Sequence, residues 1–423
     1  MRILYNIGLS IFPFFISIGA LFNKKTRLFF RGRKGLLKKV AGDVKPGNPI
    51  IWFHCSSVGE FEQARPIIEW YKKNKPQNRI LVTFYSPSGY ELRKNYDLAD
   101  WVYYLPIDTP SNARAFVNAV RPAKVIFIKY DLWYNFLHAI KNSGAELYLV
   151  SAIFRPFQPF FKWYGGFFAK MLKTFTEIFV QDEESRQNLK KIGIAGNVYV
   201  SGDTRFDRVH EITQKSRQFP VIENFVKDSF AVIAGSTWLP DEQMIAGVMK
   251  NFSKVKLVIA PHEISKERID KVSEIFERYG VVKFSELVDG GSGSSSGVMD
   301  NQKANGCKVL IIDCLGILSS LYRYANFAYI GGGFGSGIHN ILEAATYGCP
   351  VVFGPNHGKF QEAIDLIKLD GGTCVNDVNE FYEILDNCIK DNELRTWKGN
   401  VCKTYVEGHL GATEKIVGKI ENK

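Results

Sequence analysis

Two polar side chains, Asn340 and Glu343, lie in a glycine-rich segment in the second half of the chain. That segment, Tyr329–Pro355, reads as an apolar run ending in three glycines, a helix-forming stretch at His339–Tyr347, and a second apolar run. This order predicts a strand, a turn, a helix and a strand, which is one βαβ unit. Glycines let a ligand approach the backbone, and a helix start favours an anion. An amide and a carboxylate three residues apart suit a phosphate and ribose hydroxyls. A tight turn without a ligand is the alternative.

A second turn of small residues lies near the start of the chain. The apolar run Ile50–His54 predicts a strand, Ser56–Gly59 a turn, and Glu60–Tyr71 a helix. Strands and helices then alternate as far as Val198–Ser201, and a second alternation begins at Phe230–Ala234. Repeated βα units of this kind predict doubly wound parallel sheets.

The two alternating series predict an α/β protein with two Rossmann-like domains facing a cleft. We expect an N-terminal anchor with a basic flank at residues 1–30 and a first Rossmann-like domain at 31–208. A polar, less periodic linker is expected at 209–228, and a second Rossmann-like domain at 229–423. The low-complexity stretch Asp289–Gly297 predicts a flexible surface loop. One large glycosyltransferase class (GT-B type), several epimerases and some oxidoreductases share this architecture.

The net charge indicates the kind of binding partner, and the cysteine content indicates the redox compartment. The chain has 423 residues and a net charge of +11, which predicts an anionic partner: a membrane surface, a nucleic acid or a phosphorylated substrate. Much of the excess lies in the first forty residues, and no nucleic-acid-binding motif is recognised, so we expect no nucleic-acid partner. The seven cysteines include no C-x-x-C pair, which indicates a reducing compartment without a zinc site or disulfide framework.

The N-terminus predicts contact with a membrane. Ile3–Phe22 is almost wholly apolar and about as long as a bilayer core requires. Basic residues then accumulate before the first acidic residue, Asp43. This pairing predicts an uncleaved anchor on an anionic surface, with the bulk of the chain on the cytoplasmic side. Whether the segment spans the bilayer is open, because Pro13 and the polar residues also allow a monotopic anchor. A helix packed on the protein is the alternative.

Nine segments resemble one family in content and order: HCSSVGEFEQARP at His54–Pro66, YDLWYN at Tyr130–Asn135, QDEESRQNLKKIG at Gln181–Gly193, VSGDTRFD at Val200–Asp207, GSTWLPDE at Gly235–Glu242, APHEISKER at Ala260–Arg268, DCLGIL at Asp313–Leu318, GGGFGSGIHNILEA at Gly331–Ala344 and FGPNHGKFQEA at Phe353–Ala363. The family is that of the 3-deoxy-D-manno-octulosonic acid (Kdo) transferases of lipopolysaccharide synthesis. The resemblance implies an inverting glycosyltransferase that moves Kdo from CMP-Kdo to a lipid A precursor of the lipid IVA type. It also implies a location at the cytoplasmic face of the inner membrane.

The resemblance places the family's general base on Glu60 in the first, acceptor-binding domain. A carboxylate there would take the proton from an acceptor hydroxyl as it attacks the anomeric carbon. The turn residues Ser56, Ser57 and Gly59 would expose it, and their N–H groups could meet a sugar carboxylate or a lipid phosphate. Asp131 either holds the acceptor or caps the following helix. The alternative for Glu60 is a first-turn glutamate favoured by the helix dipole.

The resemblance places CMP-Kdo on the second domain. Its contacts fall on Pro261, His262, Leu315, Gly316, Ile317, Asn340, Ile341, Leu342 and Glu343. The turn formed by Gly235, Ser236 and Thr237 suits a phosphate or the Kdo carboxylate, although Ser236 and Thr237 could instead cap a helix.

The chain departs from the family at several of these positions. His262 and Glu263 stand where the family has Arg-His, so Arg268 or a lysine elsewhere would have to supply the permanent charge. Lys129 and Ile317 stand where glutamates are usual. No D-x-D motif follows a strand, and we expect neither a divalent metal nor another cofactor. The alternatives are a UDP-sugar transferase or epimerase of the same architecture, and a non-catalytic protein that binds anionic membranes.

Overall fold

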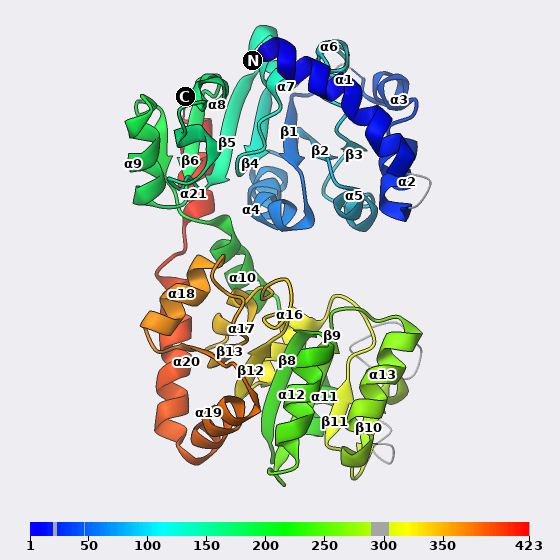
Figure 1. The fold of residues 1–423 in the computed structure, drawn as a ribbon, viewed down its shortest axis with the longest axis vertical. Helices are drawn as coiled ribbons and strands as arrows, with labels where there is room; N and C mark the ends of the chain where they lie inside the picture. Colours follow the sequence, from blue (N-terminus) through cyan, green and yellow to red (C-terminus); the bar gives the residue numbers. More distant parts are fainter. Residues whose placement is uncertain (20–22, 46, 289–303, 423) are drawn as a thin grey trace. The chain divides into compact units, whose positions relative to one another are not determined.

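The computed structural model describes residues 1–19, 23–45, 47–288 and 304–422. The stretch expected to be a flexible loop, 289–297, lies outside the described residues. The chain divides into two compact units, and each is built on its own parallel sheet (Figure 1). Unit 1 comprises Met1–Arg208 and Leu410–Lys423, and unit 2 comprises Val209–His409.

Unit 1 contains a seven-stranded parallel sheet with strand order β3-β2-β1-β4-β5-β6-β7. The strands are β1 (Ile50–Cys55), β2 (Arg79–Phe84), β3 (Trp101–Tyr104), β4 (Lys124–Ile128), β5 (Glu146–Ala152), β6 (Glu177–Val180) and β7 (Val198–Val200). The helices are α1 (Arg2–Gly19), α2 (Lys24–Arg31), α3 (Leu36–Asp43), α4 (Val58–Asn74), α5 (Pro87–Arg93), α6 (Pro110–Val120), α7 (Tyr134–Ser143), η1 (Pro159–Phe161), α8 (Gly166–Leu172), α9 (Glu183–Lys191) and α21 (Ala412–Glu421). Alternate residues of β1 enter separate buried clusters, Trp52 in one and Ile51 with Phe53 in the other, so both sheet faces are covered.

Helix α1 is held on unit 1 by polar contacts of its first turns. The hydroxyl of Tyr5 donates to Asp108 Oδ2 at 2.6 Å, and Asn135 Nδ2 donates to Asn6 Oδ1 at 2.9 Å. Ile3 and other apolar side chains near the start of α1 are exposed. No helix in the described part of the chain combines the length and apolar character needed to cross a bilayer.

The last helix belongs to unit 1. Ile416, Val417 and Ile420 are buried in the cluster that covers one face of the unit 1 sheet. Glu421 accepts a hydrogen bond from the hydroxyl of Tyr71, a helix α4 residue, at 2.6 Å. The expected domain at 229–423 is therefore wrong for residues 410–423, because the apolar face of α21 finds its partners on α4 and the first sheet.

Unit 2 contains a second seven-stranded parallel sheet with strand order β10-β11-β9-β8-β12-β13-β14. The strands are β8 (Phe230–Thr237), β9 (Val255–Pro261), β10 (Val281–Lys283), β11 (Val309–Ile311), β12 (Phe327–Ile330), β13 (Val351–Phe353) and β14 (Gly372–Cys374). Its helices are α11 (Pro220–Val226), α12 (Leu239–Met249), α13 (Lys266–Phe276), η2 (Glu277–Tyr279), α14 (Phe284–Leu287), α16 (Leu318–Leu321), η3 (Tyr322–Tyr324), α17 (Leu342–Ala345), α18 (Gln361–Lys368), α19 (Val378–Lys390) and α20 (Asn392–Glu407). Helix α10 (Thr204–Gln214) begins in unit 1, and the expected linker at 209–228 contains its end together with α11.

The glycine-rich segment forms a strand and a long turn before a short helix. The expected helix at His339–Tyr347 is reduced to the single turn of α17. Gly332 and Gly337 adopt φ values of 93° and 135°, which interrupt regular structure before that turn. The Asn340 side chain then accepts a hydrogen bond from Leu342 N at 3.2 Å, which shapes the entry to α17.

Candidate active site

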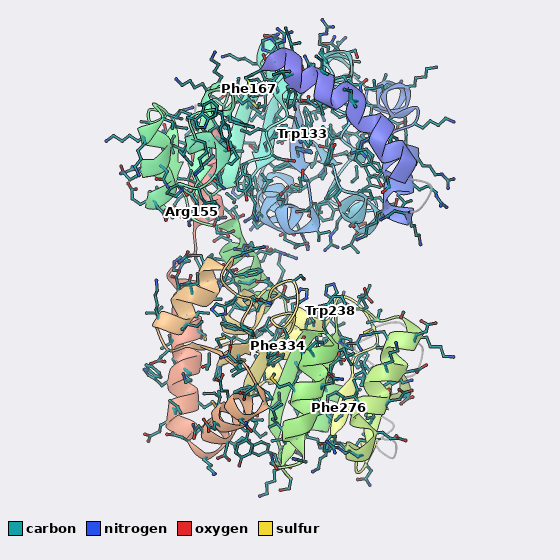
Figure 2. The ribbon with its side chains drawn as sticks, in the orientation of Figure 1. Trp133, Arg155, Phe167, Trp238, Phe276 and Phe334 are labelled. Carbon is teal, nitrogen blue, oxygen red and sulfur yellow. The ribbon has the colours of Figure 1, made fainter. Side chains whose placement is uncertain are left out.

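A polar cluster lies at the carboxyl edge of the unit 1 sheet, where neighbouring strands β1 and β4 end. Asp131 Oδ2 accepts hydrogen bonds from His54 Nε2 at 3.0 Å, from Trp133 Nε1 at 3.1 Å and from the Ser56 hydroxyl (Figure 2 labels Trp133). The other ring nitrogen of His54 lies 2.9 Å from Thr83 Oγ1 on β2. Three adjacent strands therefore bring these side chains together.

The surroundings of His54 determine which ring nitrogen carries the proton. The indole of Trp52 donates to Thr83 Oγ1 at 2.8 Å, so this hydroxyl already accepts one hydrogen bond. The same hydroxyl donates to Phe53 O at 3.4 Å and lies within hydrogen-bond distance of His54 Nδ1. Because the ionised carboxylate of Asp131 can only accept, Nε2 carries the hydrogen of the contact with Asp131. The ring is completely buried, which fixes the orientation of this pair.

Glu60 is in the first turn of α4, beside this cluster. Its N–H donates to the hydroxyl of the N-cap residue Ser57 at 3.4 Å, and its Oε2 accepts from Ser56 N. Burial raises the pKa of Glu60 and the charge of Asp131 raises it further, while the Ser56 hydrogen bond and the charge of Lys129 act in the opposite direction. Glu60 therefore holds a proton more readily than an ordinary glutamate, as suits a general base.

Asp131 is shifted in the opposite direction. Burial by itself would raise its pKa, but the hydrogen bonds from His54, Ser56 and Trp133 hold the pKa of Asp131 below its usual range. Asp131 is therefore the ionised member of the pair, and Glu60 is the member that takes up a proton first. Neighbouring carboxyl groups with separated pKa values are typical of acid–base sites.

Asp131 does not cap the helix that follows it, which was one of the two sequence-based readings. Helix α7 begins at Tyr134, and its N–H groups at Asn135 and Phe136 donate to Asp108 at 3.0 and 2.8 Å. The capping carboxylate thus comes from the loop after β3. The Asp131 carboxylate points instead to the His54 cluster.

The residues predicted for the turn lie where the sequence places them, but several of their neighbours were not predicted. Ser56, Ser57 and the exposed Gly59 connect β1 to the first turn of α4. His54 belongs to a quoted motif without an assigned role, and its alternation with Trp52 on β1 was the available signal for a shared face. Nothing in the sequence marks Thr83 as its partner.

The carboxyl edge of the unit 2 sheet carries a stack of three rings. Trp238 and His262 lie 4.8 Å apart between ring centroids, and His262 and His339 lie 4.5 Å apart. Trp238 Nε1 donates to His339 Nε2 at 3.3 Å. Burial, and then the neighbouring His262, lower the pKa of His339 to about 4, so this ring is neutral near pH 7. Trp238 follows β8, His262 follows β9 and His339 lies in the glycine-rich segment, so the stack connects these three parts of unit 2.

Asp241 holds the same two loops together. One carboxylate oxygen accepts from Trp238 N at 2.8 Å and from Gly332 N at 3.0 Å, and the other accepts from the Tyr329 hydroxyl at 2.7 Å. This buried side chain therefore ties the start of α12 to the glycine-rich turn. Sequence reasoning did not single it out.

Gly235, Ser236 and Thr237 were expected to form a turn after a strand, but they are the last residues of strand β8. Neither Ser236 nor Thr237 caps the following helix. Trp238 is the N-cap of α12, and the Thr237 hydroxyl donates instead to Glu242 Oε1 at 2.8 Å. The Arg268 guanidinium donates to the same oxygen of this buried glutamate. Arg268, expected to replace the family's missing arginine, is thus paired with a carboxylate in this structure.

The remaining predicted donor residues differ in what they can offer a ligand. Asn340 Nδ2 donates to Glu343 Oε1 at 3.1 Å, so these two side chains act together. The side chains of Pro261, Ile317, Ile341 and Leu342 are buried, which leaves only their backbone for a ligand. His262, Leu315 and Gly316 are exposed.

Comparison with known proteins agrees with these observations. Residues 29–208 match the family described as 3-deoxy-D-manno-octulosonic-acid transferase (kdotransferase). These residues resemble a Kdo transferase domain. They contain the whole Glu60 cluster. Among curated proteins, the chain is similar to 3-deoxy-D-manno-octulosonic acid transferase from Chlamydia trachomatis serovar A. The two sequences are 28% identical over a match that covers 81% of this chain and 79% of that protein. The enzyme of that name from Aquifex aeolicus is 27% identical, covering 76% and 80% respectively.

Solved structures similar to the chain include UDP-GlcNAc 2-epimerases. The enzyme from Neisseria meningitidis has a TM-score of 0.61 at 15% identity, covering 88% of this chain and 100% of that one. The enzyme from Methanocaldococcus jannaschii has a TM-score of 0.52 at 12% identity, covering 85% and 98%. At such identities the likeness shows the fold alone. The resemblance to Kdo transferases is confirmed, as is the GT-B-like class of two parallel-sheet α/β units, whereas the membrane role of α1 stays a prediction.

Proposed function

We propose that this chain transfers Kdo from CMP-Kdo to a lipid A precursor of the lipid IVA type, with inversion at the anomeric carbon. The observation that carries the proposal is Glu60, a carboxyl group with a raised pKa beside the pair of buried His54 and half-buried Asp131. All three lie within the residues that match the Kdo transferase family. General-base catalysis needs a carboxylate of this kind.

The proposed reaction uses one base and one displacement. The acceptor hydroxyl attacks the anomeric carbon, and Glu60 takes its proton as the new carbon–oxygen bond forms. The bond from that carbon to the phosphate oxygen of CMP breaks, and its electron pair leaves on CMP. Asp131 stays ionised, and its charge keeps the basicity of Glu60 high enough for the transfer. Direct displacement inverts the centre without a covalent intermediate on the protein.

The donor is assigned to unit 2. Asn340 and Glu343 would contact the nucleotide, and Gly235, Ser236 and Thr237 would lie at its phosphate or at the Kdo carboxylate. The leaving group is a monophosphate, for which backbone and basic groups suffice without a divalent metal. Turnover that continues undiminished in EDTA would agree with this part of the proposal.

An assay of the purified chain tests the reaction. CMP-Kdo and a tetra-acylated lipid A precursor are supplied, and the mass of the product lipid gives the number of Kdo residues added. UDP-sugars offered as donors should give no turnover. Turnover or epimerisation of a UDP-sugar, with none from CMP-Kdo, would assign the chain to the enzyme class of its structural neighbours instead.

We also propose that the chain acts at the cytoplasmic face of the inner membrane, with α1 in contact with the bilayer. The exposed side chains of Ile3, Leu4 and Ile7 support this, together with the basic residues that follow the helix. Replacing these three residues by serine should move protein from the membrane fraction to the soluble fraction. Full sedimentation of the variant with membranes in high salt would exclude α1 as the anchor.

A further inference from the structure

A second segment of unit 1 combines aromatic and basic residues. Residues 155–173 read RPFQPFFKWYGGFFAKMLK, with seven aromatic residues, four basic residues and no acidic residue. This aromatic segment follows β5 and includes η1 and α8. It therefore leaves the sheet at the same carboxyl edge as the Glu60 cluster.

Its largest side chains are turned to solvent. Trp163 is 96% exposed, Phe157 is 74% exposed, and Tyr164 is also exposed. Phe160, in contrast, is buried and packs against Phe154 and Phe168, with ring centroids 5.3 and 5.8 Å apart. The segment is therefore anchored by the buried ring of Phe160 and exposes the other aromatic rings named here. Clustered apolar exposure of this kind marks an interaction site.

The charge of the segment indicates the kind of partner. Lys162, Lys170 and Lys173 are exposed, and none forms an ion pair among the described residues. Arg155 is different, because it binds Asp182 Oδ2 at 2.8 Å. Exposed tryptophan and tyrosine beside unpaired lysines are the composition that enters the interface of an anionic bilayer. A protein interface would instead be poor in lysine at its centre.

Ring contacts connect the segment both to α1 and to the catalytic cluster. Tyr5 of α1 and Phe167 lie 5.8 Å apart between centroids, and Phe167 lies near the start of α1 in Figure 2. Phe160 contacts the ring of Tyr130 at 6.5 Å, and Tyr130 directly precedes Asp131. A surface that holds a lipid layer here would also bring a lipid-borne hydroxyl to the edge of the sheet where Glu60 lies.

We propose that the aromatic segment docks unit 1 on the surface of an anionic lipid bilayer. Trp163 and Phe157 enter the headgroup region, and Lys162, Lys170 and Lys173 meet anionic headgroups. This inference extends the proposed function to a second membrane contact. It rests on the proposed function only because it takes the acceptor to be a lipid. Docking is measurable without turnover, so either idea can fail alone.

The test measures partition of the full chain to phosphatidylcholine vesicles with and without phosphatidylglycerol. The double variant Trp163→Ser, Phe157→Ser should bind both vesicle types about tenfold more weakly. The triple variant Lys162→Gln, Lys170→Gln, Lys173→Gln should lose about tenfold or more on phosphatidylglycerol vesicles only. Each set is also made in the background in which Ile3, Leu4 and Ile7 are serine, so that the contribution of α1 is removed.

The matched control is Trp397→Ser in unit 2. Trp397 is 48% exposed and lies beside Lys398, as Trp163 lies beside Lys162, but it contacts no other aromatic ring among the described residues. Its loss should leave partition unchanged. Because the substituted side chains are exposed, all variants should unfold at the wild-type temperature.

Three outcomes would overturn the proposal. The first is unchanged partition of both multiple variants in both backgrounds. The second is an equal effect of Trp397→Ser. The third is wild-type self-association by light scattering that Trp163→Ser, Phe157→Ser abolishes without changing partition, which would assign the surface to a second copy of the chain. Turnover of a detergent-dispersed acceptor reports on the reaction separately, and the double variant should retain it.

Discussion

Glu60 and Asp131 share one polar cluster, yet their environments move their pKa values in opposite directions. The difference comes from hydrogen bonding. Asp131 accepts hydrogen bonds from His54, Ser56 and Trp133. Glu60 is partly buried, accepts a hydrogen bond from one backbone N–H, and is repelled by the charge of Asp131. Two identical functional groups thereby receive different tasks.

Replacing Glu60 by glutamine should slow Kdo transfer by roughly 10²–10⁴-fold, because the amide cannot accept the acceptor's proton. CMP affinity, measured by calorimetry, should persist because the nucleotide is assigned to unit 2. The acid limb of the pH–rate profile should disappear as well. A variant that keeps more than about a tenth of wild-type turnover would assign the base elsewhere.

Replacing Asp131 by asparagine should move the acid limb of kcat/KM to lower pH. The charge of Asp131 raises the pKa of Glu60, so its removal lets Glu60 lose its proton at lower pH. The base is active when deprotonated, so the rise in rate with pH should begin earlier. A limb that stays in place or moves upward would show that the two carboxyl groups are not coupled.

Motif order placed Glu60, Ser56 and Asp131 in recognisable segments, and the structure brings the three residues together, while their roles stay predictions. The His54–Thr83 contact could not be predicted, since it depends on the register between β1 and β2, where the two residues are direct partners. Asp108 was likewise missed as the cap of α7, because it lies 27 residues before the N–H of Asn135.

At the scale of elements, the carboxyl edge of the unit 2 sheet depends on close backbone approach. A Cβ added to Gly331 would lie 2.4 Å from Ser236 O and 2.6 Å from Thr237 Cα, so the end of β8 and the turn after β12 touch without room for a side chain. The glycines of this segment, expected from the sequence to admit a ligand, also admit the end of β8. The helix predicted at 339–347 is shortened to α17, because the turns at the glycines before it override the helix propensity of the neighbouring residues.

Gly331→Ala should therefore lower the stability of unit 2 by about 1–3 kcal/mol and weaken CMP binding, because one of the two segments must move. Gly335→Ala is the matched control from the same turn. A Cβ there would meet only Gly332 O, at an ordinary 3.6 Å. Thermal unfolding and calorimetry with CMP measure both effects. Equal behaviour of the two variants would contradict the contact with β8 as their cause.

At the scale of the whole molecule, Glu421 closes unit 1 by joining the end of the chain to α4 and β4. Burial would raise its pKa, but hydrogen bonds from Lys75, Tyr71 and Lys124 hold the pKa of Glu421 below its usual range. A lowered folded-state pKa stabilises the fold above the ordinary glutamate pKa, and this contribution is lost as pH falls through the folded-state value.

Glu421→Gln should consequently reduce the urea midpoint at pH 7, and the difference from wild type should shrink as the pH falls below about 4.3, the ordinary glutamate pKa. Glu414→Gln, at an exposed position in the first turn of the same helix, should change the midpoint little at either pH. A deficit for Glu421→Gln that is as large in acid as at neutral pH would show that packing, and not charge, is responsible.

The return of α21 to unit 1 also sets an order of events during synthesis. Unit 2 is continuous in sequence and can close as soon as residue 409 has left the ribosome, whereas unit 1 starts earlier and is complete only when α21 packs beside α4. At about 5–20 residues per second, the two hundred residues between them delay closure by roughly 10–40 s. During that interval the apolar side chains that α21 covers in unit 1 are exposed, so we expect newly made chains to engage chaperones through unit 1 and to be cleaved there first by added protease.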